Sequence, residues 1–568
     1  MPILQTPSRT FWRGPIVMLL LASLVACGRN DAGQQSGGTT DGGTLVVAAP
    51  AEAETLLPPL INSLAAKQIV DLLFDHLAES AADLNTVGSD GYTPRAADSW
   101  EWSPDSTAIT FHLSPTGRFH DGHPVRSADV AFSYDLTADP VVASFSRANF
   151  PPIDSVTTPD SLSIRFRFKN TSPERFYQLV SNLWVLPKHL LDTLDRQQIR
   201  TAAFGRNAVG SGPFRFVRWD ARSVIEVVAN TDYHGGRPHL DRVVFAFSGD
   251  LPTAANRVAA GEADLVEQVR AETQGALAAN PSVRFAPYGN FTNGYLLYNL
   301  WDRTSHTKPH PTLGNRGVRL ALSMAIDRYG AVKSVYDSLA LPSYGPFVRA
   351  LWTADTTISS FPYDTAAASR MLDSLGWKDS DGDGIRDKGG RRLHVDLAFP
   401  APSTTRRRLA IIFQEQWKRA GVEVKLQELD PSVMVANLAA GKFDVAVHAF
   451  GLDVSPSSIG QSWGGRNLDP ASNPSRYTNP HLDSLMAEAV LLTDRTKAKA
   501  MYREIYQGIV NDLPAAFLFE PRQISAIHKR FRTPPLRPDG WWVNIPEWSV
   551  PAAERMDRDR IGLPAAKP

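Results

Sequence analysis

The sequence has one cysteine, no surplus of charge and few apolar runs. Because Cys27 is the only cysteine among 568 residues, no disulfide can form within the chain. Basic and acidic residues number 59 each, so neither a nucleic acid nor an anionic membrane surface is favoured as a partner. The sequence also contains no His-Glu-x-x-His, Cys-x-x-Cys or phosphate-binding glycine motif. A neutral or zwitterionic ligand therefore fits this composition at least as well as a charged polymer.

The most apolar stretch lies at residues 16–26, after Arg9 and Arg13. At roughly 11 residues it is too short to cross a bilayer core, and it is typical of a secretory signal peptide. We therefore predict a signal peptide over residues 1–26.

The stretch ends in Leu24-Val25-Ala26-Cys27, an order that resembles a bacterial lipobox, in which the cysteine becomes lipid-modified. The alternative is an ordinary signal peptide with an incidental cysteine. Residues after Cys27 are rich in Gly, Ser, Gln and Thr, a composition that cannot bury enough surface to order itself. Residues 27–43 are therefore predicted to be a lipidated, flexible tether.

The rest of the chain alternates strand and helix patterns, which predicts an α/β protein. Single cores stop growing at roughly 250–300 residues, so the length favours at least two lobes. Residues 105–168 form a β-rich interval, in which positions 162–168 alternate apolar and polar side chains. The predicted elements are a strand at 44–49, a helix at 64–77 capped by Asn62 or Ser63, strand–helix units over 243–266 and 407–450, a helical stretch at 480–511, and strands at 515–519 and 524–527.

A series of short motifs runs in order along almost the whole mature chain. They are residues 100–105 (WEWSPD), 111–113 (FHL), 119–125 (FHDGHPV), 127–133 (SADVAFS), 210–216 (GSGPFRF), 230–238 (NTDYHGGRP) and 318–328 (VRLALSMAIDR). In this series the chain resembles the family 5 extracellular solute-binding proteins, which include oligopeptide- and dipeptide-binding proteins. Most of these motifs are expected to be scaffold, because stretches such as Phe119-His120-Asp121-Gly122 end a strand in an Asp-Gly turn.

The resemblance implies a two-lobed periplasmic-binding-protein-like fold of type II, in the large cluster with an extra β-rich subdomain. Hinge strands are then expected near 288–299 and 517–527. The implied organisation after the tether is lobe I at 44–287 with the subdomain at about 78–188, lobe II at 288–518, and a return to lobe I with a C-terminal tail at 519–568.

The resemblance also implies the function. A monomeric, extracytoplasmic lipoprotein would capture peptides between its lobes and deliver them to the permease subunits of an ABC importer. It would be no enzyme and would need no cofactor. The alternatives are a non-peptide ligand, such as a nickel chelate, haem or an oligosaccharide, and a sensor lipoprotein without a role in transport.

One aspartate is the main candidate for ligand binding. The predicted strand at 443–450 runs directly into Asp453, and ligands of α/β sheets sit beyond the carboxyl ends of strands. The resemblance implies that Asp453 pairs with the α-ammonium group of a peptide. The alternative is a loop aspartate that caps the next helix. The family often has Asp-Pro shortly after this aspartate, whereas this chain has Ser455-Pro456.

Two aromatic residues beyond Asp453, Trp463 and Tyr477, are candidate walls of the ligand cleft, with the lobe core as the alternative. Residues 460–464 (GQSWG) match the nucleophile elbow of α/β-hydrolases, but Ser462 lies in a loop context that argues against catalysis.

An acidic loop at 379–390 resembles the first part of an EF-hand calcium loop. The ligand candidates are Asp379, Asp381, Asp383 and Asp387, with Gly384 at the turn position. The glutamate expected at the twelfth position is replaced by Gly390. The two interpretations are a structural calcium site and a plain acidic turn.

Overall fold

The computed structural model describes residues 42–305, 307–358, 360–466 and 468–560. Cys27, the predicted signal peptide and nearly all of the predicted tether lie outside these residues. Within the described ranges, no helix combines the length and the apolar character needed to cross a membrane.

The first lobe contains a seven-stranded mixed sheet with β1 (Thr44–Ala49) in its interior. The strand order is β12 (Val283–Tyr288), β21 (Gln523–His528), β11 (Leu265–Val266), β1, β10 (Arg242–Phe247), β9 (Val224–Ala229) and β8 (Phe214–Asp220). β1 runs parallel to β10 and β11, and both of its faces are covered. Leu45 and Val47 belong to one core cluster and Ala48 to another, as the two-residue period of a strand requires.

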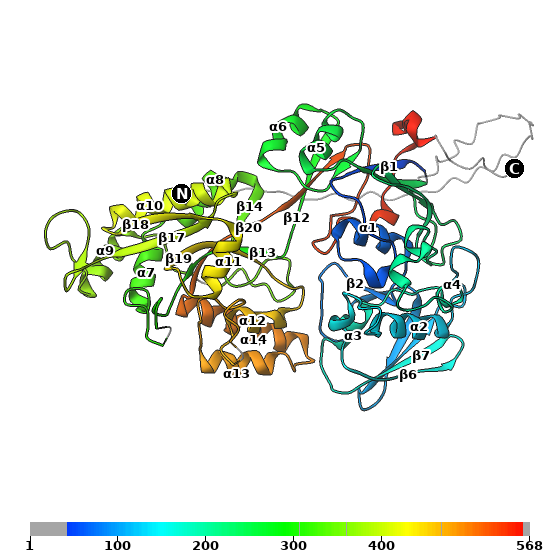
Figure 1. Ribbon diagram of the computed structural model, residues 1–568, viewed down its shortest axis with the longest axis horizontal. Helices are drawn as coiled ribbons and strands as arrows, with labels where there is room; N and C mark the ends of the chain where they lie inside the picture. Colours follow the sequence, from blue (N-terminus) through cyan, green and yellow to red (C-terminus); the bar gives the residue numbers. More distant parts are fainter. Residues whose placement is uncertain (1–41, 306, 359, 467, 561–568) are drawn as a thin grey trace, which may run out of the picture. The chain divides into compact units, whose positions relative to one another are not determined.

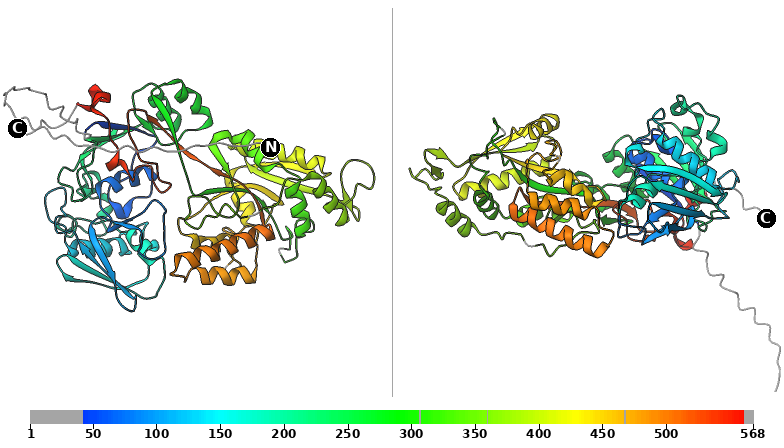
Figure 2. Two further views of the ribbon diagram at one scale, coloured as in Figure 1. Left: turned by 180° about the vertical axis from the view of Figure 1, so that it is seen from behind. Right: turned by 90° about the horizontal axis from the view of Figure 1, so that it is seen from below.

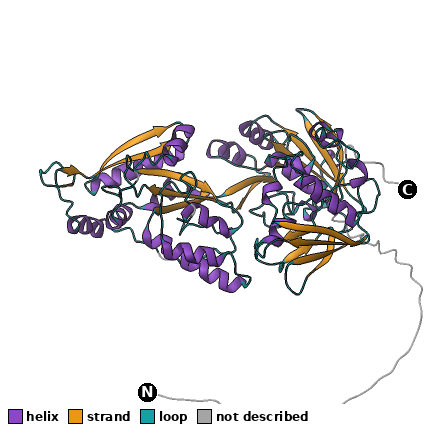
Figure 3. Cartoon of the chain, turned by 60° about the horizontal axis from the view of Figure 1, so that its bottom comes forward, coloured by secondary structure: helices purple, strands orange, loops and turns teal. Residues whose placement is uncertain are grey.

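Helices cover both faces of this sheet (Figure 3). α1 (Leu64–Leu73) packs into the cluster of Leu45, and α5 (Leu251–Ala259) and α6 (Ala271–Ala279) pack into the cluster of Ala48. Of the two predicted caps, Ser63 caps α1, because its hydroxyl accepts a hydrogen bond from the Ala66 amide.

A β-rich subdomain is inserted in the first lobe. It holds a four-stranded sheet, β4 (Ala97–Trp102), β5 (Ala108–Leu113), β7 (Ser163–Phe168) and β6 (Ile153–Asp160), and a hairpin of β2 (Ala78–Ser80) and β3 (Tyr92–Pro94). Ile164 and Phe166 are fully buried while Arg165 and Arg167 are exposed, which confirms the predicted alternation. The interval is less purely β than expected, since α2 (Ser127–Ala138) lies inside it. α3 (Arg175–Val180) and α4 (Lys188–Leu191) follow.

The second lobe is built on a six-stranded sheet. Its order is β14 (Ala340–Pro342), β20 (Ala515–Pro521), β13 (Thr292–Tyr298), β19 (Val445–Gly451), β17 (His394–Pro400) and β18 (Glu423–Leu429). Leu296 and Tyr298 point into one cluster and Tyr295 and Leu297 into the other, so both faces are buried. The first face is covered by α7 (Arg316–Met324), α8 (Arg328–Tyr336), α9 (Thr365–Ser374) and α10 (Thr404–Arg419).

The opposite face carries α11 (Pro431–Ala439), α12 (Ile459–Trp463), α13 (Pro480–Ala489) and α14 (Arg495–Asp512). The predicted helical stretch at 480–511 is therefore two helices. The break occurs because the Asp494 carboxylate caps a new helix by accepting hydrogen bonds from the amides of Thr496 and Lys497. In Figure 2 the two orange helices lie side by side.

The chain passes twice between the two large sheets (Figure 1). β12 pairs with β21 in the first sheet, and the chain continues through residues 289–291 into β13 of the second. β13 pairs with β20, and only Arg522 separates β20 from β21. The two crossings are thus neighbouring antiparallel segments.

A buried ion network joins the two ends of the described chain in the first lobe. Arg530 is 2% exposed, and it pairs with Asp264 at 3.2 Å and with Asp559 at 2.5 Å. Its guanidinium also donates to the carbonyl of Thr44 at 2.8 Å. Asp559 in turn accepts a hydrogen bond from the Thr44 amide at 2.8 Å. Each buried charge therefore has an ionic or hydrogen-bonded partner.

Two of the sequence motifs contact each other and are scaffold. The amide of Gly210 donates to Nδ1 of His120 at 3.1 Å, so Nε2 carries the proton and donates to the Gly212 carbonyl at 3.1 Å. Burial lowers the pKa of His120 to about 4, which keeps the ring neutral. Gly212 also donates its own amide to the Leu73 carbonyl at 2.8 Å, at the end of α1.

The close approach at Gly212 predicts a large effect of a single methyl group. A Cβ there would lie 2.6 Å from the Leu73 carbonyl carbon, so Gly212→Ala should lower the free energy of unfolding by about 1–3 kcal/mol or more. The matched control is Gly275→Ala in α6, where the added Cβ meets nothing within 4 Å and should stabilise the helix by about 0.5–1 kcal/mol. Thermal unfolding that ranks the two variants in the reverse order would contradict this packing.

Candidate ligand-binding site

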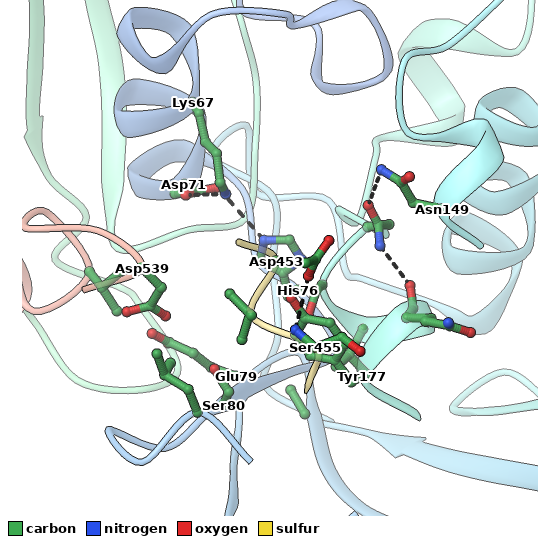
Figure 4. Close-up of a pocket in the computed structure, with 18 of the residues that line it drawn as sticks. Lys67, Asp71, His76, Glu79, Ser80, Asn149, Tyr177, Asp453, Ser455 and Asp539 are labelled. Carbon is green, nitrogen blue, oxygen red and sulfur yellow. Dashed lines mark hydrogen bonds and ion pairs between the residues drawn. The ribbon is translucent and has the colours of Figure 1, made fainter. Parts of the chain in front are cut away.

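A cavity of about 800 Å³ lies between the first lobe and the loop that follows β19 of the second. Its size is within the range of small-molecule sites. The first lobe contributes the end of α1, residues 74–84, α3 and residues 538–546, and the second lobe contributes residues 453–461. Figure 4 shows Lys67, Asp71, Tyr177, Asp453 and Asp539 around this space.

Asp453 lines the cavity two residues beyond the carboxyl end of β19. One carboxylate oxygen accepts a hydrogen bond from the Ser455 amide at 2.9 Å. No lysine or arginine within the described ranges forms an ion pair with this exposed carboxylate, and it remains open to a cationic group.

Glu174 is a second carboxyl group of the cavity, and the sequence analysis did not identify it. Its side chain comes from the first lobe, just before α3, and is 7% exposed. Ser455 donates to its two oxygens at 2.6 and 2.7 Å and Ser457 donates at 3.0 Å, both from the second lobe. Thr86 donates at 2.8 Å from the first lobe. Glu174 therefore joins the lobes beside Asp453.

Burial raises the pKa of Glu174, and the nearby Asp453 charge adds to this effect, while the hydroxyl donors oppose it. Burial, and after it the charges of Asp453 and Glu174, raise the pKa of Tyr177 far above its ordinary value. Asp453 and Glu174 thus produce a negative potential at the junction of the lobes, where Tyr177 stays a neutral phenol.

Further contacts join the lobes next to Glu174. The indole of Trp352 donates to the Thr86 hydroxyl at 3.3 Å and packs with Val87 and Ala498. An ion pair of 2.7 Å links Arg495 of α14 to Asp83. These apolar contacts, the hydrogen bond and the ion pair thus form a small interface between the two lobes beside the cavity.

Three other carboxylates of the cavity already have cationic partners. Lys67 pairs with Asp71 at 2.7 Å, Arg95 donates to Glu79 at 2.6 Å, and Arg537 donates to Asp539 at 2.7 and 2.9 Å. Although burial alone would raise the pKa of Asp71, the charge of Lys67 and a hydrogen bond with His76 bring it well below its ordinary value.

Asp75 is the exception on the first-lobe side. It is 3% exposed, and one of its oxygens accepts a hydrogen bond from the Tyr233 hydroxyl at 2.7 Å. The other oxygen is buried without a hydrogen-bond partner. Burial raises the pKa of this carboxyl group.

Trp463 and Tyr477 do not line this cavity. Both are buried in the core of the second lobe, at 3% and 4% exposure. Trp463 packs against Tyr295 and Phe517, and the Tyr477 hydroxyl donates to Asp512 at a hydrogen-bond distance. Their aromatic faces are used in packing, so the core alternative describes them and the expectation of cleft walls is corrected.

The hydrolase-like motif does not form a nucleophile elbow. Ser462 is 6% exposed inside the short helix α12, and a 3-10 turn at Pro456–Ser458 precedes this helix instead of a strand. An elbow needs the serine at a strand-to-helix turn.

The acidic loop at 379–390 contributes no residue to the lining of this cavity. Carboxylate oxygens of Asp379, Asp381 and Asp383 come within 4.8 Å of one another on an exposed turn. Asp379 accepts hydrogen bonds from the amides of Gly382 and Gly384, and Asp383 pairs with Arg392 at 2.6 Å. The fourth candidate, Asp387, instead bonds Ser380 and lies in the hairpin of β15 (Asp387–Lys388) and β16 (Arg391–Arg392). Calcium binding stays a prediction.

Two α/β lobes that are joined by two strand crossings and enclose a cavity with ligating groups from both sides define a solute-binding protein. A family model agrees with this conclusion over residues 91–467. The chain belongs to the bacterial extracellular solute-binding proteins, family 5, of which this region is the middle part.

Known relatives extend the match over most of the chain. The chain is 27% identical to the oligopeptide-binding protein AppA of Bacillus subtilis, over 94% of this chain and 97% of that protein. The structure of the same protein in complex with a nonapeptide matches with a TM-score of 0.64 and 25% identity, covering 90% of this chain and 99% of that one. Haem-binding protein A of Haemophilus influenzae is 24% identical over 75% of this chain and 78% of its own length.

The environment of Glu174 predicts a pH-dependent effect on stability. In the unfolded chain this group ionises near its ordinary pKa of 4.5, whereas burial raises the pKa in the folded protein. The folded state therefore holds a proton that the unfolded state releases, and stability falls as the pH rises above the unfolded value. Because glutamine does not ionise, the variant Glu174→Gln lacks this pH-dependent loss of stability.

The melting temperature of Glu174→Gln, relative to the original protein, should therefore increase between about pH 4 and pH 7.5. Glu415→Gln, at an exposed position of α10, is the control for removing one negative charge. A difference between Glu174→Gln and the original protein that is constant over this range would contradict the prediction.

Proposed function

We propose that this protein captures peptides in the cavity between its lobes and delivers them to the permease of an ABC importer. The observation that carries the proposal is the Asp453 carboxylate, which lies at the carboxyl end of β19 and has no cationic partner within the described structure. Membership of an extracellular solute-binding family and similarity to an oligopeptide-binding protein support it.

The chemistry of Asp453 suits the amino terminus of a peptide. A ligand ammonium that leaves water must meet a carboxylate, or its desolvation costs several kcal/mol. Asp453 lines the cavity from the second lobe and Glu174 from the first, and the Asp453 charge acts on Glu174, so one ammonium group between them would interact with both lobes at once. Such a ligand favours the conformation in which the lobes are together, to the extent that it binds that conformation more tightly.

We further propose that the protein is a lipoprotein on the extracytoplasmic side of a membrane. Its support is the apolar stretch at residues 16–26 followed by Leu24-Val25-Ala26-Cys27, with a Gly- and Ser-rich segment behind it. Diacylation of Cys27 would hold the binding lobes near the permease through this Gly- and Ser-rich segment of roughly 16 residues.

Asp453→Asn should weaken peptide binding by about 2–5 kcal/mol, because the ligand ammonium then loses its carboxylate partner. Calorimetry with a free peptide and with its N-acetylated form measures this loss. The original protein should prefer the free amino terminus, and the variant should lose most of this preference. Equal affinity of the variant and the original protein for the free peptide would disprove the anchor.

A melting-temperature screen tests the ligand class. A ligand at about 100 times its dissociation constant stabilises the folded protein by about 2.7 kcal/mol, which gives a measurable shift. Peptides should raise the melting temperature. Shifts with haem, nickel chelates or oligosaccharides alone would keep the solute-binding fold and overturn the peptide assignment.

Cys27→Ser should release the protein from the membrane fraction of the expressing bacterium into the soluble extracytoplasmic fraction. Labelled palmitate should be incorporated by the original protein and not by the variant. A Cys27→Ser protein that still sediments with membranes would show that another element anchors it.

A further inference from the structure

The charges around the cavity do not balance. Its described lining contains six carboxyl groups and only two permanently cationic side chains, Lys67 and Arg95. The carboxyl groups are those of Asp71, Asp75, Glu79, Glu174, Asp453 and Asp539.

Both cations, and a third just behind the wall, are already committed. Lys67 is neutralised by Asp71 and Arg95 by Glu79, and Arg537 is held by Asp539. None of the cationic side chains that line the described cavity is therefore left over for an anionic group of a ligand.

Three carboxyl groups of the described lining form no ion pair. Asp453 bonds only a backbone amide, Glu174 bonds only hydroxyl groups, and Asp75 bonds a tyrosine hydroxyl with one oxygen while the other has no partner. Two of them are more than nine-tenths buried, at 7% exposure for Glu174 and 3% for Asp75. Charges in such a water-poor wall act more strongly on a ligand than surface charges do.

One ammonium group at Asp453 would compensate only one of these three. We propose that the cavity selects cationic peptides, which carry at least one basic side chain in addition to the amino terminus. This inference rests on the proposed function and specifies the ligand class of the same site. The second positive group would be attracted by Glu174 and Asp75 on the wall of the first lobe.

The same imbalance acts on the carboxyl end of the ligand. The carboxylate of a short peptide would lie inside a negative wall that offers no unpaired cation within its described residues, and like charges in a binding site repel. A short peptide should therefore bind better as its carboxyl-terminal amide than as the free acid. A zwitterionic dipeptide is disfavoured on the same grounds.

The experiment uses an alanine pentapeptide series and the full mature chain. Each position in turn carries lysine or norleucine, which has a straight apolar chain of similar length, and affinities are measured by calorimetry. At one position or more, the original protein should bind the lysine peptide at least about tenfold more tightly than its norleucine partner, as for a charge-assisted hydrogen bond in a partly buried site. The amide of the norleucine peptide should bind more tightly than its acid.

Variants assign the effect to the unpaired carboxyl groups. Glu174→Gln and Asp75→Asn should each reduce the lysine-to-norleucine ratio at that position, because the lysine peptide loses more affinity than the norleucine peptide. Asp539→Asn is the matched control, because it removes the same charge from a carboxylate that already pairs with Arg537. It should leave the ratio nearly unchanged.

The outcomes separate the two proposals. Binding of neutral and basic peptides with equal affinity at every position, or tighter binding of acids than of amides, would overturn cation selection and leave peptide binding intact. An equal loss of the ratio in Asp539→Asn and Glu174→Gln would overturn the role of the unpaired groups. If no peptide of the series binds, the proposed function itself fails, and cation selection fails with it.

Discussion

The cavity depends on the way the chain passes between its two large sheets. β12 and β13 are one extended segment, β20 and β21 are another, and the two segments pair in an antiparallel manner on both sides of the junction. Few residues separate the strands at either crossing. Each large sheet therefore contains two paired strands that continue directly into the sheet of the other lobe. A ligand that contacts both lobes therefore acts directly on two short connections, where a small change in backbone angles is enough to move one lobe.

Inside that frame, the chemistry follows from the pairing of charges. Lys67, Arg95 and Arg537 are each matched to a carboxylate, which fixes the wall of the first lobe without leaving a group for an anion. Glu174 has a different environment, since hydroxyl groups from both lobes surround it. A carboxyl group solvated in this way can exchange a hydroxyl donor for a ligand cation, so it can be part of the lobe junction and part of the binding site.

The architecture could be predicted well from the sequence. The periodicity of apolar side chains reflects which of them are buried, and the family motifs reflect the same fold. The strand at 44–49, the alternation at 162–168 and the strand–helix units over 243–266 and 407–450 are all present in the structure. The error at 480–511 has a local cause, since the capping aspartate Asp494 interrupts a stretch whose composition is helical throughout. Fold class and family could be predicted in this way because they depend on patterns that repeat along the chain.

The site was much less predictable. Asp453 was recognisable because it directly follows a buried strand, whereas the meaning of Trp463 and Tyr477 depended on side-chain packing that no linear pattern specifies. Glu174 was missed because its partners, Thr86 and Ser455, are distant in sequence. Asp75 had one available signal, a charged residue at the end of the apolar run Leu72-Leu73-Phe74.

The ion network around Arg530 has a consequence for how the molecule is made. β1 is among the first described residues to be synthesised, yet its amide and carbonyl at Thr44 are bonded by Asp559 and Arg530, among the last. The buried Asp264 also pairs with Arg530, which is synthesised much later in the chain. The second lobe, which is continuous from β13 to β20, can acquire its hydrogen bonds earlier. The first lobe can therefore be completed only after the last part of the described chain has been made, so the lobe that begins the sequence is the last to become native.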